Sequence, residues 1–327
     1  MKLSVLDQSV LRSGFSAKEA LENTVRLVQL TEKLGYVRFW VAEHHNTDGI
    51  AGTSPEVLIT HLAAQTKTIK IGSGGVLLPQ YSPYKVAENF KLLETLYPNR
   101  IDLGIGRSPG GNAETRTALT DGIRKSLNEF PRQVRDLQHY LQSNKKLSNN
   151  DILAYPLIET VPDIWILGVS KRGARLAAEN GTAFTFGHFI APGNGRIALD
   201  YYYTHFQASE ALQEPKANVC IFVVCAKSQE KAEELALSQD MWLLSIAKGQ
   251  STKLESPEAI KKKVLTAEDH KIIKENRKRM IVGTKEKVRE ELVRLSKLYK
   301  TEEFMIITNI YSFEDKMESY RLLAEVF

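Results

Sequence analysis

Short apolar runs recur along the chain, separated by longer segments whose apolar residues repeat at helical spacing. An apolar run of this kind that ends in polar or glycine residues is typical of a buried strand. The predicted strands are Leu3–Gln8, Val37–Ala42, Ile69–Val76, Ile101–Gly106, Ile164–Val169, Ala183–Phe186, Val219–Ala226 and Phe304–Thr308. Because helical patterns lie between them, we expect the strands to run parallel, each joined to the next by a helix.

Helical patterns fill most of the intervals between these strands. The predicted helices are Ser16–Leu34, Pro55–Thr66, Pro83–Leu96, Lys171–Asn180, Thr284–Tyr299 and Ser312–Val326, with a long helical region from Glu114 to Asn144. Eight strands without a dividing linker favour a single (β/α)8 barrel over residues 1–327 rather than a doubly wound sheet. The charged segment from Lys248 to Met280 is longer than a connection after the seventh strand needs. We therefore predict a helical, irregular insertion there that forms a lid over the barrel mouth.

The composition is that of an ordinary soluble enzyme. The net charge of +5 is small for 327 residues, and its basic residues crowd the segment from Lys253 to Lys287. A solvated helical surface explains that segment better than a nucleic-acid groove. Cys220 and Cys225 lie in one predicted strand and point to opposite faces, so neither a disulfide nor a metal pair is expected. Without a signal-peptide pattern or an apolar run of the roughly 20 residues that span a bilayer, we expect a cytoplasmic protein.

Residues with catalytic potential follow the second predicted strand. Glu43-His44-His45 comes directly after Ala42, and ligands of parallel α/β folds gather at that edge. A histidine there can give or take a proton near neutral pH, so we predict that His44 is catalytic and that His45 is a second candidate. The alternative is a structural histidine bonded to Glu43 or the backbone. No metal is expected, because adjacent histidines project in different directions and no second ligand pair accompanies them.

Glycines mark the ends of the third and fourth predicted strands. Gly74-Gly75 interrupts a strand, which weakens it unless a bulge or the close approach of a flat ligand requires the space, and either arrangement could include an unusual peptide bond. The run from Gly104 through Arg107 and Pro109 to Gly110 invites a dinucleotide-binding interpretation, but its spacing is wrong. A glycine-bordered strand end with Arg107 as a fixed cation for a phosphate is favoured over a surface arginine in a turn.

A second candidate phosphate site opens the helix after the fifth strand. Ser170-Lys171-Arg172-Gly173 places a helix-capping residue, free backbone N–H groups and two cations at one helix N-terminus. We therefore predict that Ser170, Arg172 and Gly173 bind the cofactor together with Arg107. The alternative is that Ser170 only caps the helix.

At these residues the chain resembles the bacterial luciferase-like flavin monooxygenases. The segments that carry the resemblance are EHHNTDGIAGTSPEVLITHLAAQTKTIKIGSGGVLLP, PNRIDLGIGRSPG and LGVSKRGARLAAENGTAFTFG. It covers nearly the whole length and is strongest from Trp40 to Arg107 and from Trp165 to Gly187. The chain is most similar to the single-chain members of the family rather than to the light-emitting heterodimer.

The resemblance implies an FMN-dependent monooxygenase on a (β/α)8 barrel, which receives reduced FMN from a separate NAD(P)H:flavin reductase and uses O2 by way of a C4a-peroxyflavin. His44 matches the family's catalytic histidine beside the flavin C4a position. Gly74-Gly75 matches a small-residue pair, joined by a cis bond in luciferase, that backs the flavin ring. Arg107 and Ser170 match phosphate-side contacts, and the second phosphate arginine is either Arg116 or Arg124.

The sequence departs from the luciferase pattern at two places. Gly106 stands where the luciferase catalytic chain has a cysteine near the flavin, and Val169 replaces an acidic residue before the fifth-strand serine. Light emission therefore does not follow from the resemblance, and the sequence leaves open whether light is emitted. Two rival functions remain: a deazaflavin-dependent enzyme of the same fold that transfers hydride without oxygen, and a non-catalytic flavin-binding protein.

Aromatic residues near the strand ends suggest a small, mainly apolar organic substrate. Trp40 and Phe186 are predicted to line its site, and His188, just beyond the sixth strand, to orient a polar group on it. The predicted helices Pro55–Thr66 and Pro83–Leu96 carry more apolar residues than one core-facing stripe requires. We therefore predict a homodimer built on these two helices, as luciferase-like proteins pair, unless other parts of the chain cover them.

Overall fold

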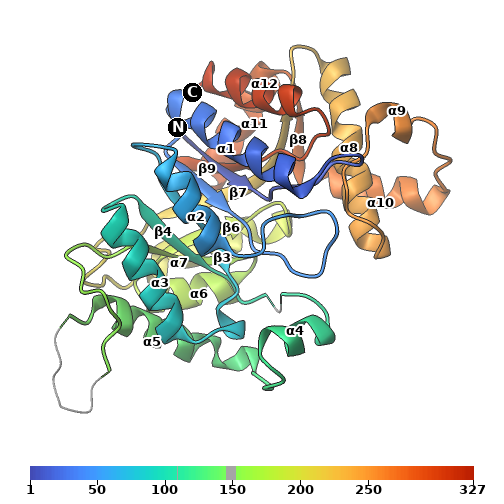
Figure 1. The fold of residues 1–327 in the computed structure, drawn as a ribbon. Helices are drawn as coiled ribbons and strands as arrows, with labels where there is room; N and C mark the ends of the chain where they lie inside the picture. Colours follow the sequence, from blue (N-terminus) through green and yellow to red (C-terminus); the bar gives the residue numbers. More distant parts are fainter. Residues whose placement is uncertain (109, 145–151) are drawn as a thin grey trace.

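The computed structural model describes residues 1–108, 110–144 and 152–327, and Pro109 and residues 145–151 lie outside the described residues. Eight parallel strands close into a barrel within this part of the chain (Figure 1), which confirms the predicted fold. The barrel strands, in order around the ring, are β1 (Lys2–Asp7), β2 (Arg38–Val41), β3 (Lys70–Val76), β4 (Ile101–Ile105), β5 (Asp163–Gly168), β6 (Ala183–Gly187), β7 (Ala217–Cys225) and β9 (Glu303–Ile307). The ring closes where β9 pairs with β1.

A ninth strand lies outside the ring and was not predicted. Strand β8 (Met280–Gly283) pairs with the second half of β7, where Phe222 is opposite Met280. The predicted insertion from Lys248 to Met280 contains helices α9 (Pro257–Ile260) and α10 (Ala267–Arg277), which project to one side of the barrel with the end of α8 (Figure 1). The interpretation of Met280 as the end of a helical region was wrong, because the short apolar run that it begins extends the sheet.

Helices surround the ring. They are α1 (Ala17–Lys33), α2 (Pro55–Ala64), α3 (Pro83–Leu96), α4 (Ala113–Leu119), α5 (Phe130–Gln142), α6 (Lys171–Glu179), α7 (Gly195–His205), α8 (Gln229–Lys248), α11 (Lys285–Tyr299) and α12 (Phe313–Ala324). Local sequence explains where several begin. Ser16 and Glu19 form a capping box at the start of α1, and α2 and α3 each begin with a proline, whose missing N–H costs nothing in the first turn.

The region from Glu114 to Asn144 is not one long helix. Helix α4 ends at Leu119, and the chain turns through Asp121 and Gly122, whose φ angles of 50° and 75° are left-handed. A glycine takes that conformation without steric cost. Helix α5 then begins at Phe130 with a proline in its first turn. The predicted helical region therefore consists of two helices separated by a turn.

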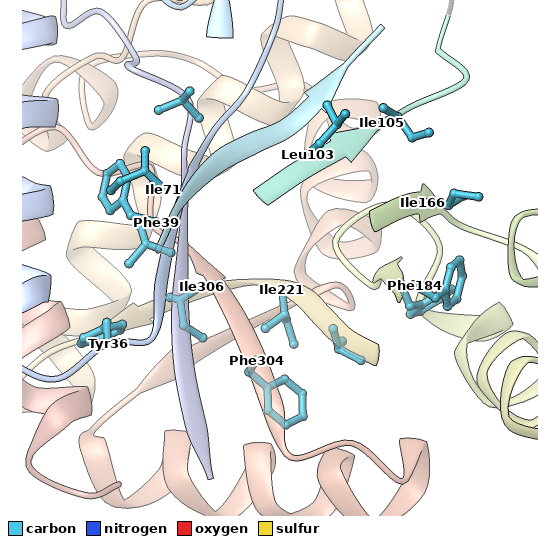
Figure 2. Close-up of a cluster of buried hydrophobic side chains, with 14 of the residues drawn as sticks. Tyr36, Phe39, Ile71, Leu103, Ile105, Ile166, Phe184, Ile221, Phe304 and Ile306 are labelled. Carbon is cyan, nitrogen blue, oxygen red and sulfur yellow. The ribbon is translucent and has the colours of Figure 1, made fainter. Parts of the chain in front are cut away.

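The strand residues divide the core into two parts. Outward-facing side chains, which include Phe39, Ile71, Leu103, Phe184 and Phe304, pack beneath the helices in one large cluster (Figure 2). Inward-facing side chains form a second cluster inside the ring with the apolar face of α8. Side chains of successive strand residues point to opposite faces, so this division follows from the alternation along each strand. Among the described residues, no helix is long and apolar enough to span a membrane.

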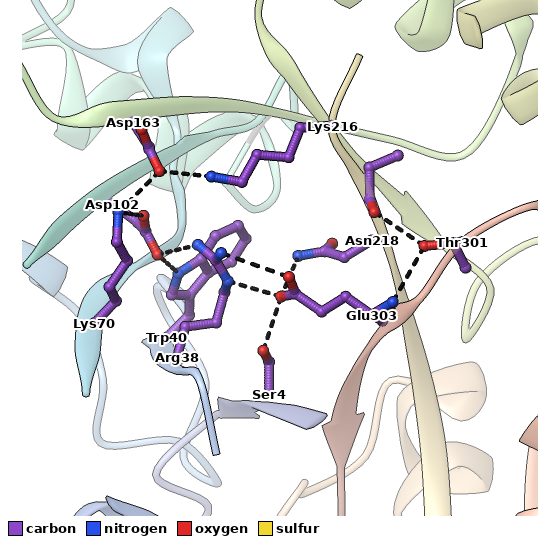
Figure 3. A network of polar contacts seen from close by, with 11 residues as sticks. Ser4, Arg38, Trp40, Lys70, Asp102, Asp163, Lys216, Asn218, Thr301 and Glu303 are labelled. Carbon is purple, nitrogen blue, oxygen red and sulfur yellow. Dashed lines mark hydrogen bonds and ion pairs between the residues drawn. The ribbon is translucent and has the colours of Figure 1, made fainter. Parts of the chain in front are cut away.

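Charged side chains close the N-terminal end of the barrel (Figure 3). Arg38 donates to Asp102 Oδ2 at 2.6 Å and to Glu303 Oε1 at 2.7 Å. Trp40 Nε1 also donates to Asp102, at 2.8 Å, and Asn218 Nδ2 donates to Glu303 at 3.2 Å. These buried charges neutralise one another, and removal of one partner would leave an uncompensated charge that costs about 3–5 kcal/mol. The opposite end of the barrel is left for a ligand.

Candidate active site

A cavity of about 1620 Å³ occupies the C-terminal end of the barrel. Small-molecule sites usually measure roughly 300–1,000 Å³, so this cavity has room for a cofactor and a second molecule together. Its wall includes residues at or just beyond the ends of six strands: Gln8, Ala42, Gly75, Gly106, Gly168 and Gly187. Five of these residues lack a side chain or carry only a methyl group, which leaves the space open.

The structure brings nine of the eleven predicted site residues to this cavity. They are Trp40, His44, His45, Gly74, Gly75, Arg107, Ser170, Arg172 and Gly173. They come from β2, β3, the ends of β4 and β5, and the first turn of α6, and the parallel sheet brings their strand ends to one edge. Their convergence does not by itself assign their roles, which are proposed below.

His44 is held by an amide from the first strand. Gln8 Nε2 lies 3.3 Å from His44 Nε2, and Gln8 Oε1 accepts a hydrogen bond from Asn309 Nδ2 at 2.7 Å. In this arrangement the Gln8 amide donates to His44 Nε2, which places the imidazole proton on Nδ1. Burial lowers the pKa of His44, and the neighbouring His45 lowers it further. His44 is therefore neutral near pH 7, and its Nδ1–H has no partner among the described residues.

His45 belongs to a separate hydrogen-bonded group. Its Nε2 lies 2.7 Å from Glu43 Oε1, and Tyr81 donates to the same carboxylate oxygen at 2.6 Å. Glu43 Oε2 accepts from the backbone N–H of Leu77 at 2.9 Å, which ties the end of β2 to the residue after β3. Burial raises the pKa of Glu43, although these donors oppose the rise. The sequence left open that one of the two histidines is structural and bonded to Glu43. His45 makes this bond.

The Gly74–Gly75 pair backs the cavity, and a cis peptide bond joins the two residues. A Cβ on Gly74 would lie 2.5 Å from Leu6 Cδ1, and one on Gly75 would lie 2.7 Å from the carbonyl oxygen of Gly104. The backbone of β4 therefore leaves no room for a side chain at Gly75, whereas a side chain at Gly74 would require Leu6 to move. Their backbone, rather than a side chain, forms this part of the wall.

Cationic and N–H groups converge at another part of the wall. Arg107 follows β4, and its buried Nε has no hydrogen-bond partner in the described structure. Ser170 is the N-cap of α6, yet its side chain makes no capping hydrogen bond. A Cβ on Gly173 would lie 3.1 Å from Gly168 Cα, so the glycine lets the helix start close against the end of β5. The N–H groups of the first helical turn lack intrahelical partners, and with Arg107 and Arg172 they suit a phosphate.

The expected second phosphate arginine is not where the sequence placed it. Neither Arg116 nor Arg124 is among the described residues that line the cavity, and Arg116 instead donates to the carbonyl oxygen of Lys125 at 3.0 Å. Arg135 of α5 and Arg175 of α6 do line it. Sequence reasoning missed both, because only the folded positions of α5 and α6 bring them to the cavity.

Two predicted substrate contacts were also wrong in position. Phe186 and His188 are absent from the described cavity wall, whereas Thr185 and Gly187 lie on it. Phe186 is fully buried against Tyr299 on the outer side of the barrel, with ring centroids 5.9 Å apart. His188 Nδ1 lies 2.9 Å from the same tyrosine's hydroxyl, and burial lowers the pKa of His188 to about 4. The alternation along β6 would have identified Phe186 as outward-facing.

The chain after α8 forms one side of the cavity mouth. Residues 249–252 line the cavity, and Asp48 from the loop after β2 accepts hydrogen bonds from Ser251 Oγ at 2.7 Å and from the Thr252 backbone N–H at 3.1 Å. Thr47 Oγ1 lies 2.6 Å from Thr252 Oγ1. These contacts join the start of the predicted insertion to the loop that carries His44. A lid function for this insertion stays a prediction.

These groups fit FMN. Arg107 and the start of α6 offer charge and hydrogen-bond donors to a phosphate, and the glycine backbone at residues 74–75 offers a flat wall to a ring. The described residues contain no group of three or more His, Cys, Asp or Glu side chains that could hold a metal ion.

Comparisons with known proteins agree with this arrangement. The family model of the luciferase-like monooxygenases matches residues 1–302. The uncharacterized protein YceB of Bacillus subtilis (strain 168) is 51% identical over 99% of both chains. The N-acetyl-S-alkylcysteine monooxygenase of the same organism is 37% identical, over 99% of this chain and 98% of its own length.

Solved structures support the same fold. The crystal structure of apo-MsnO8 has a TM-score of 0.89 and is 32% identical, and the match covers 100% of this chain and 98% of that one. Two more distant structures show the fold alone. They are the oxygenating constituent of 3,6-diketocamphane monooxygenase from Pseudomonas putida in complex with FMN (TM-score 0.71, 19% identical, 99% and 97% covered) and an F420-dependent secondary alcohol dehydrogenase (TM-score 0.73, 14% identical, 100% and 99% covered). Both flavin and deazaflavin cofactors thus occur on this barrel.

Proposed function

This chain belongs to the luciferase-like monooxygenase family, and we propose that it is an FMN-dependent monooxygenase. It takes reduced FMN from a separate NAD(P)H:flavin reductase and uses O2 to oxidise a small, mainly apolar organic molecule. The observation that carries the proposal is the shared cavity, whose wall includes an unpartnered arginine, the N-terminus of α6, a neutral histidine and an apolar barrel interior.

The protein binds FMN through its phosphate and its ring. Arg107 and Arg172 supply positive charge, and Ser170 and the first N–H groups of α6 supply hydrogen-bond donors. The Gly74–Gly75 backbone supports the ring, and the cavity wall around it keeps out water. Bound reduced FMN supplies the electrons that activate O2, so that one oxygen atom enters the substrate and the other leaves as water.

His44 controls a proton beside the reacting atoms. Because Gln8 occupies Nε2, the imidazole offers its Nδ1–H as a donor, and its lowered pKa keeps it neutral near pH 7. Gln8 is itself held by Asn309, so the ring orientation is set by a chain of two amides. Tyr81 donates a hydrogen bond to Glu43, and Glu43 in turn holds His45 at the cavity wall.

The test compares three ligands and then follows oxygen. FMN, riboflavin and coenzyme F420 are titrated into the protein, and FMN is expected to bind most tightly. The protein with reduced FMN is then mixed with oxygenated buffer, and the absorbance of oxidised FMN should return more slowly than for free reduced FMN. Preferential binding of F420 would support the deazaflavin enzyme instead. Reoxidation at the rate of free reduced FMN would support a flavin-binding protein without oxygenase activity.

The proposed assembly is a homodimer through α2 and α3. Val57 of α2 and Leu92 and Leu96 of α3 are 68%, 53% and 53% exposed, so both helices leave apolar side chains in water. A twofold partner would bury these side chains as a four-helix contact. Sedimentation at micromolar concentration should give twice the chain mass, and Leu92→Glu should lower it, whereas Val264→Glu, at an exposed apolar position outside these helices, should not. A 36.8 kDa species for the unaltered protein contradicts the dimer.

A further inference from the structure

A buried carboxylate holds His45 by one ring nitrogen. His45 Nε2 lies 2.7 Å from Glu43 Oε1, and the Glu43 side chain is only 1% exposed. Tyr81 donates to the same oxygen at 2.6 Å, and the backbone N–H of Leu77 donates to Glu43 Oε2 at 2.9 Å. A carboxyl group that accepts on both oxygens is in its ionised form, so His45 donates its Nε2–H to Glu43 as the third donor.

The other ring nitrogen of His45 is free at the cavity. Nδ1 makes no hydrogen bond within the described structure, and it is not one of the described atoms that are buried without a partner. It therefore keeps accessible surface. The His45 side chain is 14% exposed and lines the cavity. Because the proton is on Nε2, Nδ1 carries a lone pair, and a neutral His45 presents a hydrogen-bond acceptor to a ligand.

His44 presents the opposite kind of group on the same wall. Gln8 donates to His44 Nε2, so His44 offers its Nδ1–H. The two neighbouring histidines therefore hold one proton donor and one proton acceptor beside the cavity.

The other carboxylates on the described cavity wall are less suited to accept a proton. Hydrogen bonds from Ser251 and from the Thr252 backbone lower the pKa of Asp48. Glu179 pairs with Arg175 on its own helix, at 2.6 Å. Glu43 is the carboxylate on this wall that binds a histidine within the described structure.

We propose that Glu43 and His45 form a general base, in which His45 Nδ1 takes a proton from an N–H or O–H group of the ligand bound in the cavity. The ligand's N–H or O–H bond breaks, its electron pair stays on the ligand, and the Nε2–H of His45 remains bonded to Glu43. The carboxylate then faces an imidazolium, which it stabilises. His45 is thus a further catalytic residue, and Glu43 is its positioning residue. The identity of the ligand rests on the proposed monooxygenase function.

Three titratable groups face the His45 ring in the described structure. Glu43 attracts the imidazolium. Tyr81 stays neutral, because burial and its hydrogen bond to Glu43 raise its pKa far above the usual range. His44 also stays neutral near pH 7, because burial lowers its pKa. The Glu43 carboxylate is therefore the charge that governs how readily His45 takes up a proton.

The protonation of His45 is measured first, in the ligand-free protein. With 15N-labelled histidine, the NMR spectrum at pH 8 distinguishes a protonated ring nitrogen from an unprotonated one. The signals that disappear in His45→Gln identify His45. We expect a proton on Nε2 and none on Nδ1. A proton on Nδ1 would overturn the inference, because the ring would then offer the cavity a donor instead of an acceptor.

The catalytic role is then measured as a pH profile. Protein and reduced FMN are mixed with oxygenated buffer, and the rate at which oxidised FMN returns is followed. Oxidised FMN lacks ring N–H protons that reduced FMN carries, so this return includes a proton transfer. The rate should fall on the acid side, where Nδ1 is protonated. His45→Gln should lower the rate about 10²-fold at pH 8 and remove this fall. Glu43→Gln should move the fall to lower pH, because the imidazolium loses its counter-charge.

A matched control and thermal melts separate this role from a structural one. His139→Gln should leave the profile unchanged, because His139 is exposed on α5 and does not line the cavity. A purely structural His45 would lower the melting temperature without moving the profile. An unchanged profile in His45→Gln, or an unmoved acid limb in a folded Glu43→Gln variant, would therefore contradict the general base.

FMN affinity, read from flavin fluorescence, distinguishes the two proposals. If the unaltered protein does not bind FMN, the proposed function fails and the catalytic role of His45 fails with it. If FMN binds normally and the profile ignores His45, only the general base is lost.

Discussion

Replacement of Arg107 by alanine isolates the proposed phosphate contact. Its guanidinium lies on the cavity wall, and its buried Nε has no partner in the described part of the protein. In the proposed function, the phosphate of FMN pairs with this guanidinium. A hydrogen bond to a charged group contributes about 1.5–3 kcal/mol. At about 1.4 kcal/mol for each factor of ten, Arg107→Ala should weaken FMN binding roughly 10- to 150-fold.

The assay compares FMN with riboflavin, which lacks the phosphate. Isothermal titration should show that Arg107→Ala weakens FMN binding and hardly changes riboflavin binding. Added salt should reduce the difference in FMN affinity between the unaltered protein and the variant, because it screens the charge pair. The melting temperature of the ligand-free variant should not fall, since no bond of Arg107 Nε within the described structure is lost. Arg132→Ala is the matched control. Arg132 is exposed, pairs with Asp136 of its own helix and with Glu129 just before it, and does not line the cavity.

Equal losses for FMN and riboflavin would show that Arg107 acts on the cavity as a whole rather than on a phosphate. A marked fall in the melting temperature would show instead that Arg107 holds the fold. Either result would refute the reasoning from the unpartnered guanidinium, and the helix N-terminus with Arg172 would then be the remaining phosphate contact.

Three further predictions concern single positions. His44→Ala should leave FMN affinity nearly intact and lower the rate of substrate oxygenation roughly 10²-fold or more, which is the usual contribution of a general acid or base. A variant that keeps its activity would show that His44 has no part in the mechanism. Gly104→Ala should lower the free energy of unfolding in urea by about 1–3 kcal/mol, because the new Cβ would overlap the carbonyl oxygen of Ser73. Gly106→Ala is the control, because its Cβ would meet nothing within 4 Å, and it should leave the stability unchanged. A similar loss of stability in both variants would contradict this packing. The folded pKa of His188 is about 4 and its ordinary value 6.5, so the unfolded chain binds more protons between these values and stability falls as pH drops through that window. Unfolding free energies measured at pH 7, above both pKa values, and at pH 5, between them, should therefore differ less in His188→Gln than in the unaltered protein.

Features with a local cause were predictable from the sequence. All eight barrel strands were found within a few residues of their bounds, because each is a short apolar run with polar or glycine ends. The parallel order followed from the helices between them, and that order places every strand end at one edge. His44, Arg107 and Ser170 therefore reached the same cavity although they are far apart in the chain.

Some errors had a local signal that was not used. Gly122 and the proline at the start of α5 mark a break within the predicted helical region, and the prediction did not place it. Likewise, the alternation along β6 sets Phe186 on the outer face once Thr185 and Gly187 face inward. Strand β8 was harder to find, because its four residues carry no period long enough to separate strand from helix.

Other features depend on contacts between distant segments, which only the tertiary structure decides. Arg135 rather than Arg116 reaches the cavity because of how α5 packs against α3, and nothing in the spacing of the two arginines distinguishes them. The tautomer of His44 is set by Gln8 and Asn309, from the two ends of the chain. Sequence periodicity thus determined which residues lie on the barrel and at which edge, because it is a property of neighbouring residues. The partners of each side chain were decided by packing, because hydrogen bonds and charge pairs form between whichever segments the fold brings together.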